Sequence, residues 1–254
     1  MRKLLVVVYS VWCYLAFALF VPMGVVVHLL GRLPWAKEKV RSRFVLGYQM
    51  VWVGCWQALT GFRFHRHGYV HFDPKKAYVL VCNHINLLDI LVMGFYMRHH
   101  LKVLIKQAMH DFPVMGFLFR TYSIPVDKTS AKSRKESLHR MVAVLKSGVS
   151  ILIFPEGTRN RTGQPMKSFY DGAFILALEA GIPILPMVIT HSRLLQPVES
   201  WTFRPGNVHL TYLPPIPVDG YQKDQMQELK QHVFDVMLAA LREREPEFGG
   251  TLKP

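Results

Sequence analysis

Apolar residues dominate the first sixty positions of the chain. Between Leu4 and Leu30 there is no Asp, Glu, Lys or Arg, and a helix of about 20 apolar residues is long enough to cross the hydrocarbon core of a bilayer. A second apolar segment, from Phe44 to Leu59, is shorter and contains two tryptophans, which favour the boundary between lipid and water. This pattern predicts two membrane-anchoring helices within residues 1–60.

Two arrangements of these helices fit the pattern. Either the first helix spans the membrane and the second lies at its surface, or both form a hairpin in one leaflet, with Pro22-Met23-Gly24 bending the first helix. In the spanning case, the basic residues after the first helix outnumber those before it and place the rest of the chain in the cytoplasm. A cleaved signal peptide fits poorly, because the apolar run exceeds the usual length of about 7–15 residues. A buried hairpin of a soluble core is a further alternative.

Beyond Gly61, short apolar runs alternate with stretches of helical periodicity. This pattern is typical of an α/β fold with a largely parallel sheet flanked by helices, and we expect residues 61–254 to form such a domain. Strands are predicted at Tyr78–Cys82, Leu101–Ile105, Ser150–Phe154, Ile182–Thr190 and Val208–Tyr212. Helices are predicted at Leu87–Met97, Ser130–Lys146, Tyr170–Ala180 and Asp224–Arg244.

The charge of the chain narrows the choice of partner. It has 254 residues, with 31 Lys and Arg against 17 Asp and Glu, which gives a formal net charge of +14. Such an excess favours an anionic partner: nucleic acid, anionic lipids or a phosphorylated substrate. The hydrophobic share of 50% and the lack of any nucleic-acid-binding motif argue against nucleic acid. We therefore expect contact with anionic membrane lipids.

Cysteine and histidine usage bears on redox chemistry and metals. The chain has three cysteines, none in a C-x-x-C pair, so a disulfide framework is not expected and a reducing compartment fits. The pair of histidines in His65-Arg66-His67 has a spacing that could bind a metal, but no nearby carboxylate or cysteine completes a site. We therefore do not expect this pair to bind a metal.

The first chemically suggestive motif is Asn83-His84-Ile85-Asn86-Leu87-Leu88-Asp89, directly after a predicted strand. Asp89 follows His84 across a turn into a helix, so its carboxylate could accept a hydrogen bond from one imidazole nitrogen. The other nitrogen would then serve as a general base for a bound substrate hydroxyl. The alternatives are a loop histidine beside a helix-capping Asp, and a thiol nucleophile at Cys82, which is more simply a small buried strand residue.

The second motif is Phe154-Pro155-Glu156-Gly157-Thr158-Arg159, also at the end of a predicted strand. Arg159 can hold a phosphate through two parallel hydrogen bonds, Gly157 permits close approach of the backbone, and Glu156 could orient Arg159. A structural turn with a surface ion pair is the alternative. Ligands of open α/β sheets bind outside the carboxyl ends of the strands, so both motifs are expected to face one cleft.

Together these motifs resemble those of the glycerolipid acyltransferase family typified by 1-acylglycerol-3-phosphate acyltransferase. His84 and Asp89 fit the family's H-x-x-x-x-D, and residues 156–159 fit its E-G-T-R. The resemblance runs from about Tyr78 to Ile189 in the family's order. Further matching blocks are Lys106 with Pro113, Gly116 and Pro125-Val126-Asp127-Lys128, then Lys167-Ser168-Phe169-Tyr170-Asp171-Gly172, and Ile182-Pro183-Ile184-Leu185-Pro186.

The resemblance implies an activity and a mechanism. An acyl group would pass from acyl-CoA or acyl-carrier protein to the sn-2 hydroxyl of 1-acylglycerol 3-phosphate (lysophosphatidate), giving phosphatidate. His84 would be the general base and Asp89 its support. The residues implied to bind substrate are Glu156, Gly157, Thr158, Arg159, Lys106 and Lys128. The resemblance implies no metal and no organic cofactor.

Two positions depart from the family's pattern and leave the acceptor open. Ala108 stands where members often carry an acidic residue, and Lys128 stands where they often carry Arg. Lys holds phosphate less specifically than Arg, so the acceptor could be another lysolipid. A lipid-binding protein without turnover is the alternative from a different class. We expect the chain at a membrane, the bacterial inner membrane, with its catalytic domain facing the cytoplasm.

Overall fold

The computed structural model describes residues 2–30, 38–96, 101–112, 116–117, 122–126 and 131–245. The chain divides into two compact units, each assembled from three segments. The predicted boundary between residues 1–60 and 61–254 stays a prediction. The first unit comprises Met1–Arg66, Ile85–His100 and His191–Leu210, and the second comprises His67–His84, Leu101–Thr190 and Thr211–Pro254.

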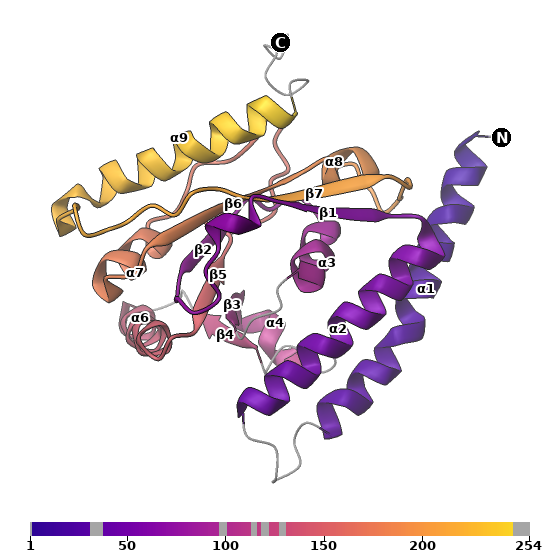
Figure 1. The fold of residues 1–254 in the computed structure, drawn as a ribbon. Coiled ribbons are helices and arrows are strands. Elements are labelled where there is room, and N and C mark those ends of the chain that lie inside the picture. The colour runs from indigo at the N-terminus through magenta and orange to yellow at the C-terminus, as the bar shows by residue number, and fades with distance from the viewer. Residues whose placement is uncertain are drawn as a thin grey trace. The chain divides into compact units, whose positions relative to one another are not determined.

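The first unit is built around two long helices that run antiparallel (Figure 1). Tyr9, near the start of α1, donates a hydrogen bond to the carbonyl of Thr60 at the end of α2, at 2.6 Å. Further along, Phe17 packs edge-on against Trp52, with ring centroids 5.2 Å apart. The elements of this unit are α1 (Arg2–Leu30), α2 (Glu38–Thr60), β1 (Arg63–His67), α3 (Leu87–Tyr96), α8 (Ser192–Leu195) and the first part of β7 (Asn207–Tyr212).

The buried face of α1 carries small residues, among them Ser10, Cys13, Ala16 and Gly24, which allow neighbouring elements to pack closely. Nε1 of Trp56 on α2 donates to the carbonyl of Cys13 at 3.0 Å. The helix continues through Pro22 without interruption. How the two helices lie in a membrane, spanning or within one leaflet, stays a prediction.

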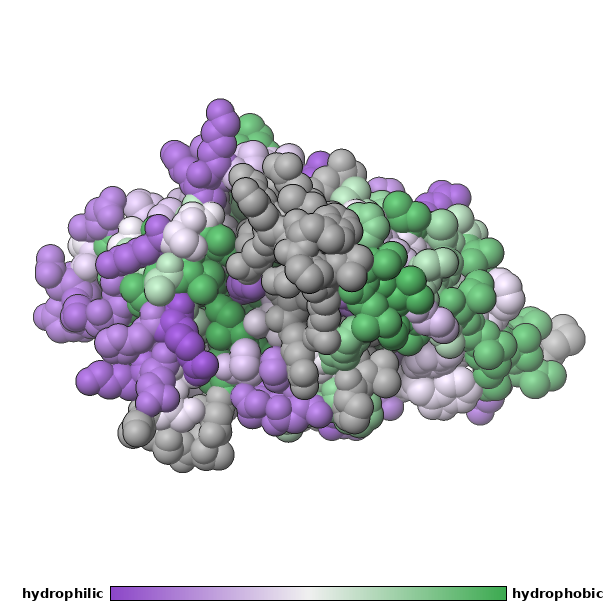
Figure 2. All heavy atoms as spheres, turned by 90° about the horizontal axis from the view of Figure 1, so that it is seen from below, coloured by the Kyte–Doolittle hydropathy of each residue, from purple (hydrophilic) through white to green (hydrophobic). Residues whose placement is uncertain are grey.

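The outward face of the hairpin is apolar. Leu4, Leu15 and Leu19 on α1 each expose more than 60% of their surface, as does Val51 on α2. Figure 2 shows hydrophobic atoms gathered over this part of the molecule. Among the described helices, α1 alone is long and apolar enough to cross a membrane. An exposed apolar surface of this kind is typical of proteins that contact a membrane or another protein.

The second unit contains parallel strands in the order β6-β2-β5-β3-β4. Val81 on β2 stands opposite both Ile153 and Pro186. Pro186 lacks an N–H, but its carbonyl accepts from Leu213 on the side away from β2, so the ladder to β2 loses nothing. The strands are β2 (Val79–Cys82), β3 (Leu101–Lys106), β4 (Ser123–Val126), β5 (Ser150–Ile153), β6 (Ile184–Thr190) and the end of β7.

Helices α6 (Ala131–Lys146), α7 (Gly172–Ala180) and α9 (Met226–Arg244) belong to the same unit. Alternate strand residues, such as Val79 and Val81 on β2, share one hydrophobic core with these three helices. Helix α7 ends at Gly181, whose φ of 65° allows its N–H to bond back to the last turn. The other residues of the central strands are also fully buried, as a parallel sheet requires.

The predicted fold class is confirmed: a mostly parallel sheet flanked by helices, with a long apolar N-terminal helix. The strands and helices predicted beyond Gly61 are all found, with ends within two residues of those expected, save that Met97 and Ser130 lie outside the described residues. The second N-terminal helix, expected from Phe44 to Leu59, is longer and runs from Glu38 to Thr60. The sequence analysis missed β1, β4 and two short helices, α4 (Gln107–Asp111) and α8.

Candidate functional site

His84 lies just beyond the end of β2, in a loop whose backbone is held on both sides. Its N–H donates to Oε1 of Glu156 at 2.9 Å, and its carbonyl accepts from the N–H of Asn160 at 2.6 Å. The imidazole stacks on the ring of Phe154, with centroids 4.2 Å apart. The two sequence motifs therefore meet, because β2 and β5 are parallel neighbours that end at the same edge of the sheet.

The preceding residue, Asn83, extends the sheet with its side chain. The Asn83 amide donates to the carbonyl of Ile189 at 2.9 Å, and its carbonyl oxygen accepts from the N–H of Ile189 at 2.7 Å. These two bonds continue the ladder between β2 and β6 by one step. Asn83 thereby fixes the point at which the chain leaves strand β2 and so the backbone position of His84.

Glu156 is the central support of this edge. Its side chain is fully buried, Oε1 accepts from the N–H of His84, and Oε2 accepts from the N–H of Lys167 at 2.9 Å. Burial raises the pKa of the Glu156 carboxyl above its ordinary value, although the two backbone N–H groups and the charges of His84 and Lys167 act against that rise. The carboxylate thus joins three loop segments.

The turn after β5 presents groups that can contact an anion. Gly157 has a φ of 70°, a conformation that favours glycine, and its N–H closes the turn on the carbonyl of Phe154 at 3.0 Å. Thr158 and Arg159 are exposed. Thr158 accepts a hydrogen bond from Nζ of Lys167 at 2.7 Å, which adds a second cation to the turn.

Within the described part of the chain, no hydrogen bond or ion pair joins the side chain of Arg159 to Glu156 or to another residue. The expectation that Glu156 orients Arg159 therefore has no contact to support it. Lys106, the last residue of β3, is exposed, and β3 runs beside β5, so Lys106 ends at the same edge of the sheet. Lys128 lies outside the described residues.

Asp89 belongs to the first unit, in the first turn of α3. It is fully buried, and its Oδ2 accepts from the backbone N–H groups of Ile85 and Asn86, the latter at 2.9 Å. A carboxylate in this place caps the helix and is stabilised by the positive end of its dipole. These contacts agree with the capping alternative noted for Asp89, and its support of His84 stays a prediction.

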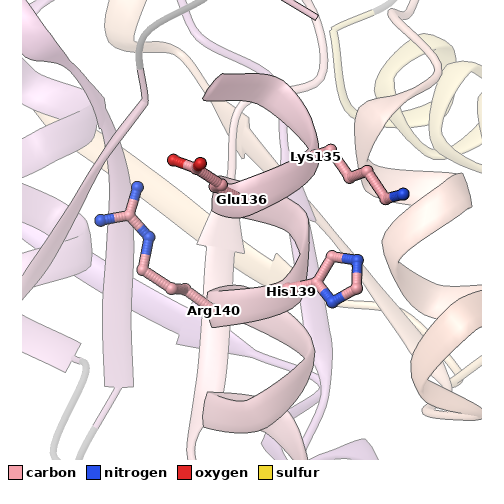
Figure 3. A pocket seen from close by; sticks show the side chains of 4 residues that line it. All are labelled: Lys135, Glu136, His139 and Arg140. Carbon is pink, nitrogen blue, oxygen red and sulfur yellow. The ribbon is translucent and has the colours of Figure 1, made fainter. Parts of the chain in front are cut away.

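A separate pocket of ≈ 540 Å³ lies on helix α6 of the second unit. Figure 3 shows Lys135 and His139 pointing to one side of the helix, and Glu136 and Arg140 to the other. All four side chains are exposed, and cationic groups outnumber the one carboxylate. These side chains suit either a solvated helix face or a contact for phosphates or anionic lipid.

Sequence reasoning missed the residues that hold the motifs in place. Asn160 is fully buried and binds the His84 carbonyl, and its side chain also donates to the carbonyl of Gln164 at 2.9 Å. Its only signal was its position next to the E-G-T-R motif. Within the described ranges, no group of three or more His, Cys, Asp or Glu side chains could hold a metal ion.

The chain matches a known protein family over the region that contains the site. The family model for acyltransferases matches residues 63–190, about half of the chain, and includes every site residue described above. The chain belongs to the acyltransferase family. The predicted resemblance is confirmed.

Several relatives of this acyltransferase share one name among themselves. The 1-acyl-sn-glycerol-3-phosphate acyltransferase of Cocos nucifera is 26% identical over 226 residues, which cover 86% of this chain and 69% of that protein. The 1-acyl-sn-glycerol-3-phosphate acyltransferase alpha of Ovis aries is 31% identical over 187 residues, covering 73% of this chain and 65% of that protein.

A solved structure shares the fold. The 1-acyl-sn-glycerophosphate (LPA) acyltransferase PlsC from Thermotoga maritima superposes with a TM-score of 0.81 at 23% identity, and the match covers 96% of this chain and 98% of that chain. At this level of identity the match establishes a common architecture. What the two proteins bind has to be argued from their sites.

Proposed function

We propose that this acyltransferase moves a fatty acyl group from acyl-CoA or acyl-carrier protein to the sn-2 hydroxyl of 1-acylglycerol 3-phosphate, giving phosphatidate. The main observation behind the proposal is the hydrogen bond from the His84 N–H to Glu156. It joins the loop of the candidate base to the turn that contains Arg159, the candidate phosphate-binding residue. The names of the relatives from Cocos nucifera and Ovis aries support the same acceptor.

In this mechanism His84 takes the proton from the acceptor hydroxyl as the oxygen attacks the thioester carbonyl. A new C–O bond forms, the C–S bond breaks, and the proton on His84 passes to the departing thiolate. Asp89 supports the imidazolium while it carries the charge. The acceptor phosphate is held by Arg159 through paired hydrogen bonds, and Lys106, Lys128 and the turn at Gly157-Thr158 also contribute to its binding.

We further propose that the α1–α2 hairpin holds the protein on a membrane. The exposed leucines of α1 would enter the apolar layer, and the basic surface of the chain would contact anionic lipids. The lysophosphatidate acceptor is itself a membrane lipid, so such an anchor would bring the site to its substrate. The bacterial inner membrane, with the site on the cytoplasmic side, is the location that we propose.

Particular residues bear on two alternative functions. Lys128 in place of Arg would suit another lysolipid acceptor, because an ammonium group is less selective for a phosphomonoester than a guanidinium. A lipid-binding protein without turnover would need the fold and the cations, but it would have no use for a general base at His84.

The experiment is a thiol-release assay on the purified full-length protein in detergent. Acyl-CoA and acyl-carrier protein are offered as donors, each with lysophosphatidate, glycerol 3-phosphate or a neutral lysolipid as acceptor. Thiol release that depends on lysophosphatidate supports the proposal and identifies the donor. Faster release with another acceptor would overturn the substrate assignment. Lysophosphatidate binding without any thiol release would favour the binding-only alternative.

A further inference from the structure

Side chains bind four consecutive N–H groups where the chain enters helix α3, from Ile85 to Leu88. The first N–H groups of a helix and those of the residues just before it have no partner within the helix, so other groups must bind them. Oδ2 of Asp89 accepts from the N–H groups of Ile85 and Asn86. The N–H of Leu88 donates to Oδ1 of Asn86 at 3.0 Å. The remaining one, the N–H of Leu87, donates to Oε1 of Gln196 at 3.1 Å.

Gln196 reaches this turn from a distant part of the same unit. It follows helix α8 and is buried, with 6% of its surface exposed. The contact is reciprocal, because the side-chain amide of Asn86 donates to the carbonyls of Ser192 at 2.8 Å and of Gln196 at 2.9 Å. Three hydrogen bonds therefore join the segment before Asp89 to the segment 192–196.

Neutral amides share the hydrogen bonding of this turn with the Asp89 carboxylate. The side-chain oxygens of Asn86 and Gln196 accept from the N–H groups of Leu88 and Leu87, so Asp89 accepts only from the other two. Without Gln196, the part-buried N–H of Leu87 would lose its partner, which is unfavourable. The turn would then rearrange, and the N–H groups of Ile85 and Asn86 that hold the Asp89 carboxylate belong to the same turn.

We propose that Gln196 is a positioning residue for acyl transfer, which fixes the orientation of the Asp89 carboxylate by holding the first turn of α3. This inference rests on the proposed function, in which Asp89 supports His84. A displaced carboxylate would slow the proton transfer while leaving the groups that hold both substrates in place. The loss of Gln196 therefore acts on kcat and leaves KM close to its original value.

The test compares Gln196→Met with a matched control, Gln57→Met. Gln57 lies in the same unit, and its Oε1 also accepts from one backbone N–H, that of Phe64, at 2.8 Å. We expect Gln196→Met to lower kcat about ten-fold or more, since small displacements in a site cost turnover, with KM for both substrates unchanged. Gln57→Met should lower the melting temperature to a similar extent and keep kcat. Equal loss of kcat in both variants, or none in Gln196→Met, would overturn the proposal.

A second variant and a second measurement guard against a simple loss of folding. Gln196→Glu keeps an oxygen opposite the N–H of Leu87 and should retain more kcat than Gln196→Met. Amide hydrogen exchange over residues 85–88 should rise in Gln196→Met and stay unchanged in Gln57→Met. Exchange does not depend on the reaction. If the wild type transfers no acyl group, the proposed function fails, and unchanged exchange in Gln196→Met separately overturns the role of Gln196.

Discussion

The two ends of the motif Asn83–Asp89 belong to different units and are held by different chemistry. The His84 end is fastened in the second unit by a buried carboxylate, Glu156, which accepts from two backbone N–H groups. The Asp89 end is fastened in the first unit by two neutral amides, Asn86 and Gln196. The chain passes from one unit to the other between His84 and Ile85.

This difference shows how the charge is placed. At the His84 end the support can carry a charge, because Glu156 accepts hydrogen bonds and the histidine supplies the reactive group. At the Asp89 end the reactive group is itself the carboxylate, and its two supports are neutral amides that add no second negative charge. The comparison predicts unequal effects when each support, and the group that it serves, is changed.

The largest effect is expected for Asp89→Asn. The amide oxygen of Asn can still accept from the N–H groups of Ile85 and Asn86, so the helix cap persists while the charge is lost. We expect kcat to fall about 10²- to 10³-fold with little change in melting temperature, measured by thiol release and calorimetry. The control is Asp171→Asn, which removes an ion pair with Lys230 and should keep kcat within about two-fold. A full kcat in Asp89→Asn would show that Asp89 serves only as a cap.

Glu156→Gln should affect both stability and turnover. Gln offers one acceptor oxygen where Glu offers two, so the N–H of either His84 or Lys167 is left without a partner. We expect the free energy of unfolding to fall by about 1–3 kcal/mol and kcat to fall about ten-fold or more. Glu179→Gln changes an exposed glutamate paired with Lys223 and should do neither. A variant Glu156→Gln with wild-type stability would contradict the supporting role.

The raised pKa of Glu156 adds a prediction about pH. The folded protein holds the proton of this carboxyl more tightly than the unfolded chain, so deprotonation costs the folded state stability. The advantage in unfolding free energy of the wild type over Glu156→Gln is therefore largest at and below the ordinary pKa of 4.5. It should shrink as the pH rises from there through the raised pKa. Denaturant titrations of both proteins across this range measure the difference, and an advantage that grows with pH would contradict the direction of the shift.

Arg159→Lys tests phosphate binding separately from the base at His84 and its support at Asp89. Lys keeps the positive charge but cannot form the paired hydrogen bonds of a guanidinium. We expect KM for lysophosphatidate to rise about ten-fold with kcat little changed, because the base and its supports are untouched. Arg242→Lys, on the exposed face of α9, is the control. An unchanged KM in Arg159→Lys would remove Arg159 from the acceptor site.

The smallest effect is expected in the pocket on α6. If this pocket receives the phosphates of the donor, Lys135→Gln should raise KM for the donor about two- to three-fold, the effect of one exposed cation, and leave KM for the acceptor unchanged. Lys146→Gln, in the last turn of the same helix, should change neither constant. Steady-state kinetics at low salt give both values, and equal effects of the two substitutions would favour the solvated-face interpretation.

The sequence predicted the strands that are buried on both sides, because their continuous apolar runs are distinctive. It did not predict β1, whose residues Arg63–His67 are mostly polar, or β4, which contains Pro125. Strand β4 is the last in the order of the sheet, where proline is tolerated. Hydrophobic pattern is a weak signal for strands of this kind.

The sequence also predicted the groups that could do chemistry but not those that hold them. His84 and Glu156 are recognisable because each belongs to a short motif with a definite spacing. That Glu156 binds the backbone of His84 instead of Arg159 depends on the register of β2 with β5, which no local pattern reveals. Gln196 is more than one hundred residues from Leu87, and only the folded chain brings the two together.

The most direct test of the account is the initial rate of thiol release by His84→Ala with lysophosphatidate and the preferred donor. The backbone N–H and carbonyl of residue 84 remain, so the bonds to Glu156 and Asn160 persist and the variant should fold. The account predicts that the rate falls by about 10³-fold or more and that added imidazole restores part of it. A folded His84→Ala variant with full activity would contradict the central claim that His84 is the general base.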